Sequence, residues 1–178
     1  MSNQISRDQL GFDFKFSHYN SEGELLHEED FAPNSMVNEG FNTMFHSFFT
    51  NEAGYHPTDF EVGLSASEVF TITTTHANIL EELEGGAEDP DTSYARQTVE
   101  RNLTDITFVD DFTIQTKDLE FHNTSVKIWT PAKTAVMVAN TGEGKKLVCF
   151  KSLSLPRQLA PNDKLILQIR QKGVAIGD

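Results

Sequence analysis

Hydrophobic and polar residues alternate along most of the chain with a period of two. Residues 11–18 place Phe12, Phe14 and Phe16 on one side and polar residues on the other, which is typical of a strand with one buried face. Short strands that do not alternate with helices predict an all-β fold, a β-sandwich or jelly roll. The same period predicts further strands at residues 25–31, 60–64, 68–74, 95–101, 106–114, 118–122, 125–129, 134–140, 146–154 and 164–172.

The stretch near residues 36–50 follows the helical period instead and predicts one substantial helix. Asn34 and Ser35 offer capping oxygens before it, and Glu39 adds negative charge in its first turn. We expect its apolar stripe to be buried against a sheet, so that Phe45→Ala lowers the free energy of unfolding by about 3–5 kcal/mol. The stripe consists of Val37, Phe41, Met44, Phe45 and Phe48.

The segment 75–91 interrupts the β-pattern. Residues 77–84 predict a short helix that ends at Gly85 and Gly86, and the acidic, proline-containing residues after it predict an exposed loop. We therefore expect an N-terminal arm at residues 1–10, followed by a β-sandwich domain at residues 11–178 with an exposed 75–91 loop.

Composition narrows the possible classes of partner. The chain has 178 residues, enough for one domain, and its net charge of -13 argues against binding to nucleic acid or to an anionic membrane. No apolar run approaches the roughly 20 residues of a membrane span. The polar N-terminus lacks the apolar core of a signal peptide, and a single cysteine, Cys149, fits a chain that matures in reducing cytosol.

The charge is unevenly distributed along the sequence. Residues 1–90 carry 17 acidic and 2 basic side chains, whereas residues 91–178 carry 10 acidic and 12 basic ones. This asymmetry has two interpretations. It reflects either chance variation of a solvated surface or a polarised molecule whose acidic and basic poles meet different neighbours.

Residues with metal-binding chemistry lack the spacing of known metal sites. The six histidines show no metal-ligand motif, and neither the acidic run 28–30 nor the pair 110–111 has the spacing of a calcium loop. Asp118, Glu120 and His122 lie at alternate positions and would share one face of a strand. The solvent face of an amphipathic strand is the favoured interpretation, so we expect no metal site.

Catalytic signatures are equally weak. Cys149 lies in an apolar strand and is expected to be a buried, inert thiol, and no nucleophile motif or phosphate-binding loop is present. The glycines of residues 142–146 fit a hairpin turn better than a phosphate site. We expect no catalytic residues, no cofactor and no enzymatic activity.

Several short motifs follow one another in a fixed order, and each has a physical task. Gly40 allows the start of the helix to approach another backbone closely, and Gly63 within a strand indicates a bulge or an aromatic ring packed over it. Arg96 is expected to form a structural ion pair, and residues 162–163 form the turn before the last strand. The motifs are VNEGFN at 37–42, FEVGL at 60–64, YARQ at 94–97, AVMVA at 135–139, the strand 147–155 and PNDKL at 161–165.

The order of these motifs, across roughly residues 34–172, resembles a family of small virion structural proteins of tailed bacteriophages. The resemblance implies a capsid decoration (cement) protein that binds the major capsid protein shell and stabilises it. It also implies a homo-oligomer, a trimer or dimer, on the capsid exterior of a virion assembled in the host cytoplasm. The candidate contacts with neighbours are the arm 1–10 and the loop 75–91.

A second class of function stays open, a tail or fibre component that binds a host receptor or carbohydrate. Carbohydrate sites expose aromatic side chains, but this chain has one Trp and three Tyr, and its 14 Phe are expected to form core. The structural role is therefore favoured. A jelly-roll enzyme would require a histidine–carboxylate cluster on neighbouring strands, which the spacings do not supply.

Overall fold

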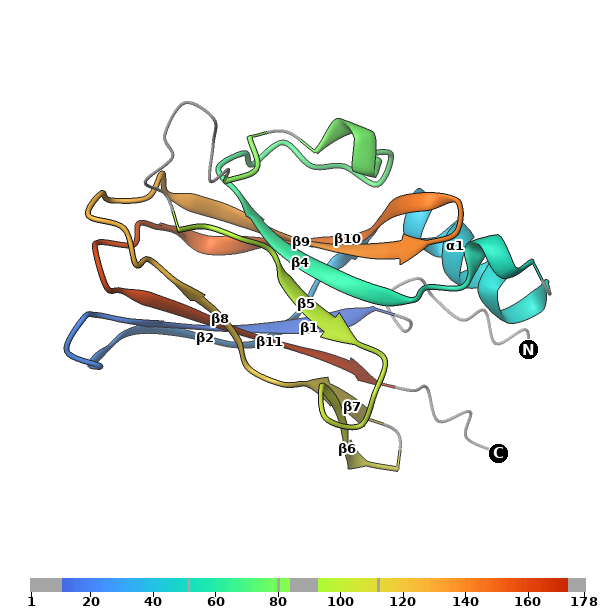
Figure 1. Cartoon of the computed structure of the whole chain (residues 1–178), viewed down its shortest axis with the longest axis horizontal. Coiled ribbons are helices and arrows are strands. Elements are labelled where there is room, and N and C mark those ends of the chain that lie inside the picture. Colours follow the sequence, from blue (N-terminus) through green and yellow to red (C-terminus); the bar gives the residue numbers. More distant parts are fainter. Residues whose placement is uncertain (1–10, 51, 80, 84–92, 112, 173–178) are drawn as a thin grey trace, which may run out of the picture.

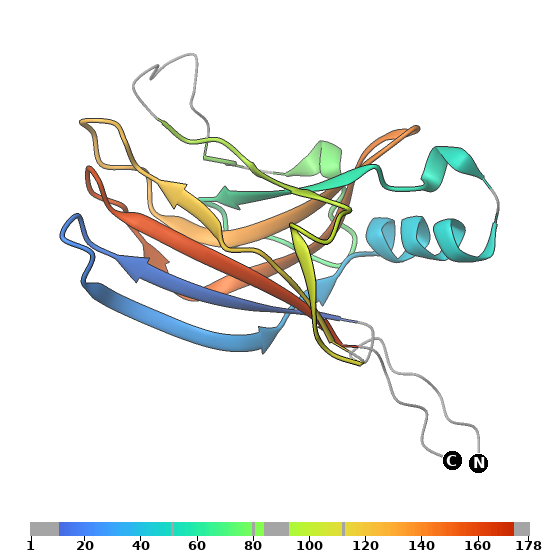
Figure 2. The ribbon, with the colours of Figure 1, turned by 60° about the horizontal axis from the view of Figure 1, so that its bottom comes forward.

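Two antiparallel sheets stack face to face in the computed structural model, which describes residues 11–172 except 51, 80, 84–92 and 112 (Figures 1 and 2). The predicted all-β sandwich is confirmed. The expected arm 1–10 and residues 84–91 of the expected loop lie outside the described residues.

The first sheet, sheet A, has the strand order β2-β1-β11-β7-β6, and β8 also pairs with β11. Its centre is the antiparallel pair of the first and last strands, whose register runs from Phe12 opposite Gln171 to Tyr19 opposite Lys164. The strands are β1 (Phe12–Tyr19), β2 (Leu25–Pro33), β6 (Ile106–Asp110), β7 (Thr113–Thr116), β8 (Leu119–His122) and β11 (Lys164–Lys172).

The second sheet, sheet B, has the order β3-β10-β9-β4-β5. The long hairpin of β9 and β10 forms its centre and turns at residues 141–144, where the sequence predicts a hairpin turn. The strands are β3 (Ser35–Met36), β4 (Asp59–Ser65), β5 (Gln97–Glu100), β9 (Ala132–Thr141) and β10 (Gly144–Arg157).

The main core lies between the two sheets. Phe14 and Phe16 of β1 are buried on its sheet A side, as the alternation predicts, and Leu64 and Met137 close it from sheet B. Asn162 takes a positive φ of 67° in the turn that leads into β11, and the Asp163 carboxylate accepts a hydrogen bond there from the Ala160 N–H. The predicted turn at residues 162–163 is thus confirmed.

The central strands β9 and β10 of sheet B are buried on both faces, which explains the continuous apolar run of β9. Val136 and Val138 point away from the main core into a second, smaller one, which also contains Phe70 and Phe150 with ring centroids 5.4 Å apart. Phe70 belongs to residues 67–79, which lie across this outer face without pairing as a strand.

Four predicted elements are therefore wrong. Residues 106–114, expected as one strand, contain β6 and the start of β7, which pair with each other as an antiparallel hairpin. Residues 68–74 are a covering segment whose apolar residue Phe70 fills the second core, so their alternation does not reflect a strand. Residues 125–129 form a loop because the Asn123 amide donates to the Lys127 and Leu159 carbonyls and holds the chain in bends. The helix predicted at residues 77–84 is only a 3-10 turn at His76–Asn78, after which Glu82 forms a bridge with Ser65.

The predicted helix is confirmed as α1 (Asn38–Phe49), which lies at one end of the sandwich against β10 (Figures 1 and 2). The predicted caps are wrong, because Val37 precedes the helix without a side-chain cap. Glu39 has a different task from the one its position suggested. Its carboxylate accepts the backbone N–H groups of His76 and Leu147 at 2.7 and 2.8 Å and so ties the helix to two other segments.

The predicted burial of the helix stripe is wrong for its phenylalanines. The side of α1 that meets the sandwich carries the small residues Gly40 and Thr43, and a Cβ on Gly40 would lie 2.2 Å from the Val148 carbonyl oxygen. The helix backbone therefore lies on β10 at a distance that only glycine allows, as predicted for Gly40. This orientation turns Phe45, 51% exposed, and Phe48, 76% exposed, toward solvent.

Gly40→Ala should destabilise the protein although alanine favours helices by about 1 kcal/mol over glycine. The added methyl group forces α1 away from β10, and overpacking of this kind costs about 1–3 kcal/mol or more. Urea unfolding measures the loss. Asn42→Ala, at an exposed position of the same helix, should stay within about 0.5 kcal/mol of the parent, and equal stability of both variants would contradict the close contact.

Phe16→Ala and Phe45→Ala should differ sharply in thermal or urea unfolding. Phe16 is 1% exposed in the main core and its truncation should cost about 3–5 kcal/mol. Phe45→Ala should cost the single chain about 1 kcal/mol or less, because half of the ring is already in water, and unfolding is measured at a protein concentration too low for copies to associate. Similar losses in the free energy of unfolding for the two variants would show that Phe45 is buried.

Candidate functional site

The residues singled out for metal chemistry lie on the polar side of β8. Glu120 lies 3.0 Å from the Lys164 ammonium and 3.8 Å from the His122 imidazole, and Asp118 accepts a hydrogen bond from Gln168 at 2.6 Å. Leu119 and Phe121 between them are buried. The alternation therefore predicted correctly which residues of this strand face the core and which face solvent. Across the described part of the chain, no group of three or more His, Cys, Asp or Glu residues is placed to hold a metal ion.

Cys149 is fully buried in β10, as the sequence indicates. Burial raises the pKa of its thiol far above the usual range, since the thiolate would lose its hydration. A thiol in this state is a packing group and a poor nucleophile.

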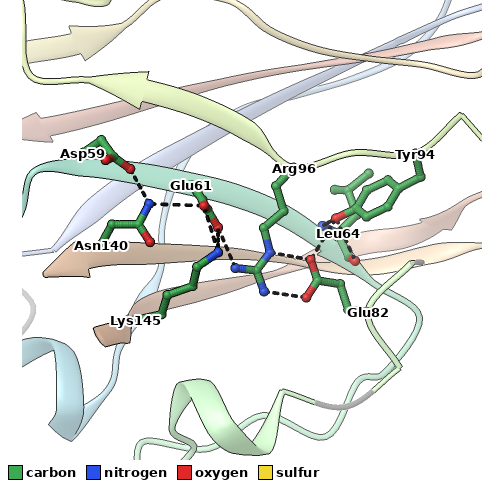
Figure 3. Close-up of polar contacts among 8 residues, drawn as sticks. All are labelled: Asp59, Glu61, Leu64, Glu82, Tyr94, Arg96, Asn140 and Lys145. Carbon is green, nitrogen blue, oxygen red and sulfur yellow. Dashed lines mark hydrogen bonds and ion pairs between the residues drawn. The ribbon is translucent and has the colours of Figure 1, made fainter. Parts of the chain in front are cut away.

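The densest polar cluster is centred on Arg96 and lies on sheet B (Figure 3). Its guanidinium donates to both carboxylate oxygens of Glu82, at 2.6 Å each, and to Glu61 at 2.9 Å. The Lys145 ammonium binds both oxygens of the same Glu61, at 2.8 and 2.9 Å. The predicted structural ion pair of Arg96 is confirmed.

Tyr94 extends this cluster over Gly63. Its hydroxyl accepts the Leu64 N–H at 2.7 Å and lies 3.3 Å from a Glu82 oxygen (Figure 3). A Cβ on Gly63 would lie 2.8 Å from the Glu82 carboxylate and 3.0 Å from the Tyr94 hydroxyl, so the expectation of an aromatic side chain over this glycine is confirmed. The cluster fastens the segment around residue 82 to β4 and has the character of a structural clamp.

The sequence suggests an acidic pole and a basic pole, but the ion pairs of the structure bring the two kinds of charge together. Acidic side chains of the first half meet basic side chains of the second half within one molecule, because β10 and β11 lie among the early strands. The pairs are Asp13–Lys172 at 3.2 Å, Glu29–Arg157 at 3.4 Å, Glu61–Lys145 at 2.8 Å and Glu68–Lys133 at 3.4 Å.

The feature most suited to an external contact is the outer side of α1, here called the phenylalanine face, which comprises Phe41, Phe45, Phe48 and Phe49. These side chains are 37%, 51%, 76% and 74% exposed. Phe45 lies 6.1 Å from Phe41 and 4.6 Å from Phe49, measured between ring centroids, so the rings form one continuous surface. An exposed aromatic group of this size is typical of a protein interaction site.

An apolar cavity of about 160 Å³ lies directly beside this face, between the ends of the two sheets. Phe48 belongs to both the face and the cavity wall. A cavity of this size and lining accommodates about one benzene-sized group. Its walls come from α1, the β6–β7 hairpin and sheet B and include Met44, Phe48, Phe60, Ile106, Ile114 and Met137.

No family model matches the chain, and no curated protein matches it either. None of the helices in the described ranges is both long and apolar enough to cross a membrane.

The helical period groups Phe41, Phe45 and Phe48 of the phenylalanine face on one stripe but predicts that this stripe is buried, and it leaves Phe49 out. A usable signal was present, since Gly40, Thr43 and Ser47 recur on the opposite side of the same helix. Such a stripe of small residues allows close backbone packing and competes with the aromatic stripe for the buried side. The cavity had no signal in the sequence because its walls come from segments far apart along the chain.

The Arg96 cluster predicts a specific acid sensitivity. Burial alone would raise the pKa of Glu61, but hydrogen bonds from Lys145, Asn140 and Arg96 outweigh it and lower the pKa from 4.5 to about 2. The folded state therefore gains stability from ionised Glu61 above pH 4.5 and loses it as the pH falls toward 2.

Glu61→Gln should accordingly be less stable than the parent at pH 7 and should lose less further stability between pH 4.5 and 2. Urea unfolding at a series of pH values measures both curves. Glu22→Gln, in the exposed β1–β2 turn, should follow the parent curve. Parallel curves for Glu61→Gln and the parent would show that the cluster does not hold Glu61 ionised.

Proposed function

We propose that this protein is a virion structural protein of a tailed bacteriophage, a capsid decoration protein that binds the major capsid protein shell and stabilises it. In this role the protein acts by binding and has no catalytic activity. The observation that carries the proposal is the phenylalanine face beside an open apolar cavity, on a sandwich whose conspicuous polar cluster is already paired.

A rigid scaffold with one apolar contact surface suits a protein that reinforces a shell. The two sheets and the second core fix the position of α1, so little conformational entropy is lost when its face is covered. Aromatic rings packed against a partner supply much of the binding energy of stable protein contacts. The ordered motifs that resemble phage virion proteins include the start of this helix.

The alternative, a carbohydrate-binding module of a tail or fibre, receives less support from the aromatic residues. Trp129 is 3% exposed and Tyr94 is tied into the Arg96 cluster, so neither offers a ring for stacking on a sugar. The exposed rings are phenylalanines, which contribute no hydrogen bonds to a hydroxyl-rich ligand. These observations favour a protein partner.

The purified protein should bind to expanded shells that lack it and appear as additional density in electron micrographs. Shells that carry it should also withstand heating to a higher temperature than bare shells, because a ligand stabilises the state it binds. Phe48→Ser combined with Phe49→Ser should reduce occupancy at least about tenfold. Val126→Ser, which alters an 82% exposed residue outside α1, is the matched control.

Bare shells at saturating protein concentration would contradict the proposal. In that case a glycan array tests the alternative, since binding to host glycans would identify a receptor-binding module.

A further inference from the structure

We propose that the phenylalanine face of α1 joins two copies of this chain into a symmetric dimer. The inference rests on the proposed function for its meaning in shell assembly. If the face joins two copies, the dimer reaches the shell through its other surfaces, and variants of the face lower shell occupancy because each molecule loses the second attachment that its partner copy provides. Three observations support a second copy as the occupant: the size of the face, the charge around it and its arrangement along the helix.

The exposed rings supply a large part of the area that a stable dimer requires. A phenylalanine presents on the order of 150–250 Å², so the exposed parts of the four rings amount to about 360–600 Å² per copy. A standard interface buries about 800 Å² on each partner. The rings alone thus supply roughly half of one side, in the centre of the contact, where aromatic side chains contribute most.

The second observation is that the phenylalanine face carries little charge, which favours contact between two identical acidic molecules there. With a net charge of -13, two copies repel each other wherever acidic surface meets acidic surface. The sequence of α1 contains one carboxylate, Glu39, which is occupied by the backbone N–H groups of His76 and Leu147. At the other end of the helix the Glu52 carboxylate lies 3.4 Å from the His46 imidazole, which is its neighbour there.

The arrangement of the rings permits pairing with an identical helix. Phe41, Phe45 and Phe49 are spaced four residues apart and form one ridge, and two such ridges interlock when helices cross at about −50°. A two-fold axis through the ridge brings the same patch of both copies together. Phe45 contacts the ring on either side of it and is the central residue, so it should lie nearest the axis.

Sedimentation equilibrium of the intact chain provides the first test. The parent should form a dimer whose dissociation constant rises more than about 30-fold in the Phe45→Ser, Phe49→Ser double variant. Val126→Ser combined with Ile128→Ser is the matched control and should dimerise like the parent. These two exposed residues belong to the loop between β8 and β9, which lies at the end of the sandwich opposite α1 in both views (Figures 1 and 2).

A charge-swap experiment tests the symmetry itself. Phe45→Glu and Phe45→Lys should each be monomeric, because every copy would place a charge beside the same charge across the axis. An equimolar mixture should recover a dimer, since Glu then faces Lys. Circular dichroism and thermal unfolding of each single variant verify that it is folded, which the exposure of Phe45 leads us to expect.

The outcomes separate this inference from the proposed function. A parent that stays monomeric at all concentrations, a double variant that dimerises like the parent, or a mixture that stays monomeric would overturn the dimer. If the parent is monomeric but decorates shells in a manner that depends on Phe45, the face contacts the shell and the proposed function stands. If the dimer forms and shells remain bare, the proposed function fails and the dimer stands.

Discussion

The close approach of helix α1 to strand β10 is the contact on which the surface of this protein depends. The absence of a side chain at Gly40 brings the two backbones together at Val148, and the Glu39 carboxylate fastens the same helix turn to His76 and Leu147. Once this small-residue side faces the sandwich, helical geometry requires the aromatic residues on the other side to face outward. The phenylalanine face is thus a consequence of how the helix packs.

The support under this helix comes from the burial of the central strands of sheet B on both faces. Strands β9 and β10 contribute to the main core on one side and to the smaller core around Phe70 and Phe150 on the other. A sheet enclosed in this way resists bending, because its side chains are close-packed on both faces. It therefore holds α1 in one position and keeps the cavity beside it open.

Ion pairs within the chain reduce the basic charge that the surface offers to a partner. Lys145, Arg157 and Lys172 are engaged by carboxylates of the first half of the sequence, so much of the basic charge of the last third is balanced internally. The phenylalanine face carries no charged side chain of its own, so like-charge repulsion between copies does not act at its rings.

The sequence by itself determined the alternation in β1 and β11 and the position of α1, because each depends on neighbouring residues. It also indicated that Gly40 needs a closely packed backbone and Arg96 a carboxylate, but the partners Val148 and Glu61 lie far away along the chain and are known only from the structure. Only the tertiary structure decided which side of α1 is covered, since periodicity groups residues on a face without stating what lies against it. It also made residues 68–74 a cover over the second core, distributed the charges and formed the cavity, because each of these depends on segments that meet only after folding.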